Sequence, residues 1–319
     1  MEESLTESTV LVDIAPQPAR AEQKKVEPDE KKTKKPPSGL AALDSTLLRL
    51  NKFISSAHGT ERAFATVGYS AHILHYALTH SRTLNRLALS ALGRKPPVSS
   101  RSKGAAAASA AAASHPHLLA LASLVSETRT SLRLLGLLPL WAWGSSTYKS
   151  PPTDPVLRAI AYTQVLACVI FQLLENVAFL ASKGVLSKRA VERWGSLPKW
   201  SLWSVRAWLV HVVLEFVRVA RESQVEAARR RRDGFKQDEK KEKDAADAER
   251  GLREKTKEEA VKMALKVRAW RKSLVNSLAW LPLCLHWSVD GGIGVPASLV
   301  GVLSLTAGAW GIHDLWLST

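Results

Sequence analysis

Residues 291–313 read GGIGVPASLVGVLSLTAGAWGIH and contain no Asp, Glu, Lys or Arg, although a highly charged stretch precedes them. A helix rises about 1.5 Å per residue, so this segment is long enough to cross a hydrocarbon core of roughly 30 Å. Soluble helices rarely stay uncharged over such a length. The segment therefore predicts a membrane protein with a C-terminal transmembrane helix or helical hairpin.

Small residues recur within this segment at alternating steps of four and three. They are Ala297, Gly301, Ser304, Gly308 and Gly311. This spacing places them on one face of a helix. Because lipid gives no hydrophobic gain to helix pairing, such a face favours close approach of two backbones and van der Waals contact. We predict a helix-packing face, within the chain or between copies; the alternative is that glycine is simply frequent in membrane helices.

The composition of the whole chain favours an anionic membrane as its partner. The chain has 319 residues, a formal net charge of +16 and eleven tryptophans. The charge alone fits nucleic acid or an anionic leaflet. Long apolar blocks and Trp, which prefers the membrane interface, favour phospholipid, and no nucleic acid partner is expected. Both cysteines, Cys168 and Cys284, lie in apolar segments, which argues against a disulfide or a zinc site.

Two amphipathic helices are predicted over residues 39–92, after a tail (1–38) that has too few apolar residues to offset the entropy of ordering. His58 and Gly59 should separate these helices, and Thr60 should cap the second. Apolar residues recur in both at helical spacing. Those expected to insert into a membrane are Leu43, Leu47, Leu50, Ile54, Phe64, Val67, Leu74 and Leu78.

Basic residues surround these apolar faces. Between Leu40 and Lys103 there are nine Lys or Arg against two acidic residues. Arg49, Lys52 and Arg62 are expected at the membrane surface, where each basic residue contributes about 1 kcal/mol of attraction to anionic lipid. An apolar face with a basic surround is typical of a helix that lies in the membrane interface. The alternative is that the faces pack on each other in a helical bundle.

The remaining chain divides by composition into four further regions. An Ala/Ser/Pro linker is expected at 93–117 and a membrane-associated helical region at 118–220. Residues 221–272 hold eighteen Lys or Arg and twelve Asp or Glu among strong helix formers, which predicts a solvated, charged helical arm. Residues 273–319 are the predicted membrane anchor. The fold class is therefore all-α, with amphipathic helices, a helical bundle, the arm and the anchor.

A polar stripe marks the apolar segment that begins at Val156. Gln164, Cys168, Gln172 and Glu175 share one helix face. Such a stripe either bonds a neighbouring helix or lines a water-filled path, and packing is the commoner role. Under the positive-inside rule the arm and the basic N-terminal helices should both be cytosolic. An even number of crossings must then separate them, and the blocks at 156–180 and 200–219 could supply two, or neither crosses.

Three blocks of the sequence resemble the peroxisomal biogenesis factor 11 (peroxin 11) family. In LRLNKFISSAHGTERAFATVGYSAHIL (48–74), a Phe-centred helix precedes a Gly-x-Glu-Lys/Arg turn that Gly59, Glu61 and Arg62 match. LEFVRVARESQVEA (214–227) is similar to the helix before the arm in that family. GAWGIHDLWLST (308–319) resembles the closing Gly-x-x-Asp-x-Trp signature through Gly311, Asp314 and Trp316. The tail and linker look like those of the divergent fungal branch.

This resemblance implies a protein of the peroxisomal membrane that elongates and constricts the organelle before scission, often as a homo-oligomer. By the same resemblance, its partners would include a dynamin-related GTPase and its adaptors. The residues suggest a mechanism: the apolar faces of the two N-terminal helices would act as a wedge that expands the outer leaflet and favours positive curvature.

Other function classes have less support in the sequence. There is no Gly-rich phosphate loop, nucleophile elbow or His/Asp/Glu constellation, so no catalytic residue, cofactor or metal ligand is predicted. A solute channel is the main alternative, because polar residues occur in apolar surroundings at Gln164, Gln172, Glu175, Arg206 and Glu215. A role at membrane contact sites is a further alternative.

Overall fold

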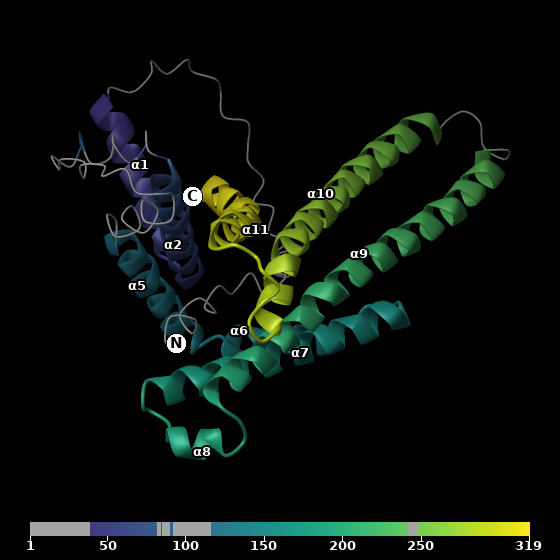
Figure 1. Ribbon diagram of the computed structural model, residues 1–319. Coiled ribbons are helices and arrows are strands. Elements are labelled where there is room, and N and C mark those ends of the chain that lie inside the picture. Colours follow the sequence, from purple (N-terminus) through teal and green to yellow (C-terminus); the bar gives the residue numbers. More distant parts are fainter. Residues whose placement is uncertain (1–38, 82–83, 85–89, 92–115, 242–247) are drawn as a thin grey trace. The chain divides into compact units, whose positions relative to one another are not determined.

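The computed structural model describes residues 39–81, 84, 90–91, 116–241 and 248–319 (Figure 1). Every regular element in these ranges is a helix, and no strand occurs among them. This confirms the predicted all-α fold class. The predicted tail (1–38) lies outside the described residues, as does nearly all of the predicted linker (93–117).

The helices form two compact units. The first holds α1 (Gly39–Ile54), α2 (Ala57–His80), α5 (Pro116–Arg133) and α11 (Ala297–Ser318). The second holds most of α6 (Leu137–Lys149), together with α7 (Pro155–Ser182), α8 (Lys188–Glu192), α9 (Leu197–Lys241) and α10 (Ala248–Ser288). The regions drawn from composition at 118–220 and 273–319 therefore each contribute helices to both units.

In the first unit, α2 packs against both α5 and α11, and α1 turns back onto α2. The corner between α1 and α2 lies earlier than predicted. The side chain of Ser56, not Thr60, caps α2, because its Oγ accepts the N–H of Gly59 at 3.0 Å. Gly59 is thus inside the first turn of α2, where an added Cβ would lie 1.8 Å from the carbonyl oxygen of Phe53. Only glycine fits this close approach.

A buried arginine joins α2 to α5 in the first unit. Arg129 of α5 donates to Glu61 Oε1 at 2.8 and 2.6 Å and to the Tyr69 hydroxyl at 3.0 Å, both on α2. Burial raises the pKa of Tyr69, although the charge of Arg129 opposes this effect. The hydroxyl therefore stays neutral, and the charge of Arg129 is balanced by Glu61 alone among these partners.

In the second unit, α9 packs along α7 and α10 packs along α9. Asp154 starts α7, because its Oδ1 accepts the N–H of Leu157 at 3.0 Å and Pro155 follows with no N–H of its own. Asp154 also accepts a hydrogen bond from Arg221 of α9 at 2.7 Å. Further along α7, Gln164 meets Glu215 and Phe171 meets Ser204, which come earlier and earlier in α9, so the two helices are antiparallel. The predicted charged arm is the outer part of α9 and α10 (Figure 1).

The uncharged segment 291–313 is not one helix. Gly291, Gly292 and Gly294 have φ values of 79°, 71° and 83°, which favour glycine, and α11 begins only after Pro296. Within the described ranges, the one helix long and apolar enough to cross a membrane is α7. The candidate span is thus α7, whereas α11, within the predicted C-terminal anchor, follows a glycine turn and packs on α2. The C-terminal anchor stays a prediction.

Candidate functional site

The predicted membrane-inserting residues of α1 are all exposed. Leu43 and Leu47 are about 60% exposed, and Leu50 and Ile54 more than 40%. Leu48, which was not predicted, is exposed to a similar degree as Leu47. A single exposed leucine is ordinary, but several on one short helix form an apolar surface that calls for a partner.

The residues predicted on α2 divide between the surface and the interior. Val67 and Leu74 are exposed, and Phe64 is half-buried. Leu78, in contrast, is buried inside the first unit. The exposed apolar surface of α2 is therefore narrower than we predicted from the helical spacing. Some of the apolar residues at that spacing pack inside the first unit.

The three basic residues predicted at a membrane surface contact α11 in the structure. The Arg49 guanidinium lies 4.5 Å from the centroid of the Trp316 ring and donates to the Trp316 carbonyl at 3.0 Å. Lys52 Nζ donates to the main-chain oxygen of Thr319 at 3.1 Å. Arg62 is buried and donates to His58 Nε2 at 2.7 Å. Its guanidinium is turned toward α11 and away from the surface.

The predicted small-residue face of α11 lies against α2. Gly301 and Gly311 are buried, Ser304 is fully buried and Gly308 is half-buried. A Cβ on Gly301 would come within 3.4 Å of the Tyr69 carbonyl oxygen on α2. A Cβ on Gly311 would meet Arg62 Nη1 at 1.9 Å. Ala297 begins α11, and its side chain lies outside the described part of the molecule.

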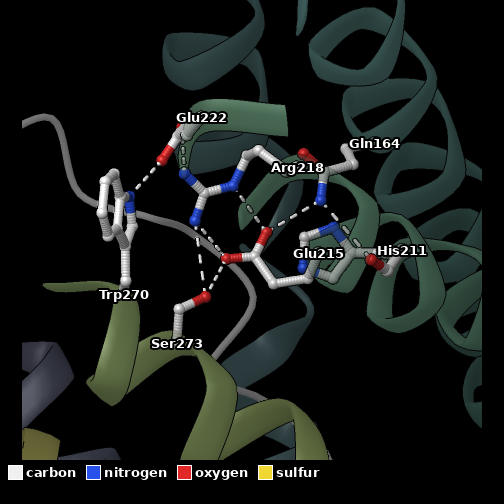
Figure 2. A network of polar contacts seen from close by, with 7 residues as sticks. All are labelled: Gln164, His211, Glu215, Arg218, Glu222, Trp270 and Ser273. Atoms are coloured by element: carbon white, nitrogen blue, oxygen red, sulfur yellow. Dashed lines mark hydrogen bonds and ion pairs between the residues drawn. The ribbon is translucent and has the colours of Figure 1, made fainter. Parts of the chain in front are cut away.

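Glu215 of α9 is the centre of a polar network that joins three helices (Figure 2). It accepts from Gln164 of α7 at 2.9 Å, from Arg218 Nε at 2.9 Å and from the Ser273 hydroxyl of α10. Arg218 also pairs with Glu222 at 2.6 Å, and Glu222 accepts from Trp270 Nε1 at 2.7 Å. The network fixes the relative register of α7, α9 and α10.

Several of the polar residues that supported the channel alternative are hydrogen-bonded to one another or to nearby main chain. Gln164 and Glu215 belong to the network above. Gln172 donates to Asn176 at 2.8 Å, one turn along α7, and Arg206 donates to the carbonyl of Ser288 at 2.9 Å. These bonds favour the helix-packing role for the polar stripe, which was the commoner of its two possible roles.

Sequence spacing did not reveal the aromatic contact at the end of α11. Phe53 of α1 is buried, and its ring lies 6.3 Å from that of Trp316. Helical periodicity reports which residues share a face, whereas this contact joins residues more than 260 positions apart. The only available signal was that Phe53 and Trp316 each stand in a family-like motif.

Comparison with known proteins identifies the family. The model of peroxisomal biogenesis factor 11 (PEX11) matches residues 104–316, more than half of the chain. An uncharacterized protein of Schizosaccharomyces pombe is 26% identical over 237 residues, which cover 73% of this chain and 88% of that protein. No solved structure matches significantly. The chain therefore belongs to the peroxisomal biogenesis factor 11 family, and it is a protein of the peroxisomal membrane that acts in peroxisome biogenesis.

Proposed function

We propose that the chain remodels the peroxisomal membrane by inserting the exposed leucine face of α1 into the cytosolic leaflet. The observation that carries this proposal is the exposure of Leu43, Leu47, Leu50 and Ile54 on one face of α1. Insertion of this face expands one leaflet relative to the other, which favours the elongation and tubulation that precede fission. The action is mechanical, and no catalytic step is part of it.

The gain from insertion is large enough to drive binding. Complete burial of a leucine side chain contributes about 1.5–3 kcal/mol, and these leucines are roughly half exposed beforehand. Burial of the four apolar side chains therefore contributes on the order of 3–6 kcal/mol. This gain is comparable to that of a single acyl chain, so α1 binds reversibly and needs a second anchor.

The second unit supplies an anchor in this proposal. If α7 crosses the membrane, the first half of α9 crosses back beside it, because the two helices pack antiparallel, even though α9 is not apolar enough to count as a span by itself. Arg221 then returns to the side of Asp154, to which it is bonded. The charged arm would thus lie on the same side as the start of α7. This arrangement has the even number of crossings that the positive-inside rule requires.

The partners that we propose for this activity are those that membership of the family implies. Homo-oligomers would concentrate the α1 wedges on one patch of anionic phospholipid, and a dynamin-related GTPase with its adaptors would cut the elongated membrane. The arm, with its eighteen basic and twelve acidic residues, offers a charged surface for such adaptors.

The test uses the full-length chain reconstituted into anionic vesicles. Leu47→Glu should abolish tubulation, because it places a charge in the face that enters the acyl chains. Ser55→Glu is the matched control: it adds the same charge at an exposed position just beyond α1 and should leave tubulation intact. Tubulation that survives Leu47→Glu would refute the wedge. Conductance lost with Glu175→Ala, without tubulation, would support the channel instead.

A further inference from the structure

The exposed leucine face of α1 is free for lipid, but the basic side of the same helix is occupied. Arg49, Lys52 and Phe53 contact the end of α11 through Trp316 and Thr319. We refer to these five residues as the clasp. All five lie in the first unit, and the contacts combine two hydrogen bonds, one cation–π contact and one aromatic pair.

The end of α11 offers oxygen acceptors to Arg49 and Lys52, as a phosphate group would. The last carbonyls of a helix lack partners within it and form the negative end of the helix dipole. The last turn of α11 contains no basic residue of its own. Arg49 and Lys52 supply the missing cations from α1, by donating to the main-chain oxygens of Trp316 and Thr319.

We propose that anionic lipid headgroups and the end of α11 compete for Arg49 and Lys52, so that the clasp restrains α1 until an anionic membrane replaces the end of α11 as the partner of these two side chains. A phosphate oxygen carries a negative charge, so it attracts the cationic groups of Arg49 and Lys52 more strongly than a neutral main-chain carbonyl such as that of Trp316 does. The inference rests on the proposed function, because it regulates the same α1 surface.

The rest of α11 packs closely on α2, so the clasp can hold α1 at the end of α11. Gly301 permits close packing on α2, and the buried Arg62 fills the space that Gly311 leaves open. Opening the clasp therefore releases α1 from the end of α11 without requiring α11 to leave α2. By linkage, a change that opens the clasp and leaves Arg49 and Lys52 in place should strengthen the binding of α1 to anionic lipid.

The test measures the distance between α1 and the end of α11 in the full-length chain. Spin labels at Asn51→Cys and Ser318→Cys, both exposed, report the clasp once Cys168 and Cys284 are replaced by Ala. In vesicles of phosphatidylcholine we expect a single short distance. Addition of phosphatidylserine should create a second, longer distance, and high salt should reverse this change. One unchanged short distance in both lipids would overturn the clasp.

Two variants and one control make the result specific. Trp316→Ala should raise the ratio of long to short distances about two- to fivefold in phosphatidylcholine alone, as expected for loss of a cation–π contact. Arg49→Gln should also open the clasp but should weaken its response to phosphatidylserine. Trp310→Ala, on the same helix more than one turn earlier, should do neither. An effect of Trp310→Ala equal to that of Trp316→Ala would contradict the clasp.

The outcomes for the clasp and for the wedge can be separated. If distances respond to phosphatidylserine but Leu47→Glu still tubulates vesicles, the wedge fails and the clasp stands. If Leu47→Glu abolishes tubulation but the distances never change, the wedge stands and the clasp fails.

Discussion

At the scale of single residues, Asp154 has two roles at the start of α7. It caps the helix through Leu157 and pairs with Arg221 of α9. Asp154→Ala should lower the free energy of unfolding of the second unit, because both roles are lost. Asp154→Asn keeps a capping oxygen, so it should lower the free energy of unfolding less than Asp154→Ala does. Chemical denaturation in detergent compares the two, and equal costs would show that the cap contributes nothing.

Because of Asp154, we also expect the stability of the second unit to depend on pH. The hydrogen bond from Arg221, and then that from the Leu157 N–H, lower the pKa of Asp154 below its ordinary value. Its stabilising contribution is therefore complete above the unfolded pKa of about 3.9 and disappears as the pH falls through the lower folded pKa. The stability difference between the wild type and Asp154→Asn should be constant near neutral pH and should vanish in acid. Thermal unfolding at several pH values measures it; a difference that grows in acid would contradict this assignment.

Gly311 and Gly308 form a matched pair on α11. A Cβ at Gly311 would clash with the buried Arg62, whereas a Cβ at Gly308 would only touch Ile312 at 3.8 Å. Gly308→Ala should stabilise the first unit by up to about 1 kcal/mol through helix propensity. Gly311→Ala should destabilise it by about 1–3 kcal/mol, since Arg62 must move. Thermal melting tests the opposite signs; equal shifts would mean that α11 does not pack on α2 as described.

At the scale of elements, α7, α9 and α10 depend on one buried carboxylate. Glu215→Ala would leave Arg218 and Gln164 without this partner, and loss of one member of a buried charge pair costs about 3–5 kcal/mol. Glu226, on the same helix, pairs with the more exposed Lys266, so Glu226→Ala should cost about 1 kcal/mol or less. Denaturant unfolding compares both variants. A similar cost for the two would show that the network does not hold the three helices together.

At the scale of the whole molecule, the antiparallel packing of α7 and α9 makes a prediction about sidedness. Lys188→Cys lies at the start of α8, in the connection between these helices, and Gln224→Cys lies near the start of the arm. A large maleimide-polyethylene glycol added to intact peroxisomes should label Gln224→Cys and spare Lys188→Cys. Detergent should expose both positions. Labelling of both without detergent would mean that α7 lies on the membrane and does not cross it.

Local sequence patterns predicted many of the helices, but they could not predict contacts between residues far apart in the sequence. The spacing of Leu43, Leu47 and Ile54 predicted α1, and the long apolar segment predicted α7, because helix periodicity is local. Hydropathy predicts a transmembrane helix or hairpin over 291–313, but it does not reveal the turn at Gly291, Gly292 and Gly294. The contact of Arg62 with α11 was also missed: a basic residue beside an apolar face reads as a surface group until its partner, 246 positions later, is known.

The continuity of α9 has a mechanical consequence. This helix runs without a break from Leu197 to Lys241, a length of about 68 Å at 1.5 Å per residue. A sharp kink would require the loss of main-chain hydrogen bonds at that point, so the two ends of the helix tilt together. In the proposed topology the helix is therefore a lever: a protein that pulls sideways on its charged tip applies a torque to the end in the membrane, and a change in bilayer curvature around that end swings the tip through a wide arc.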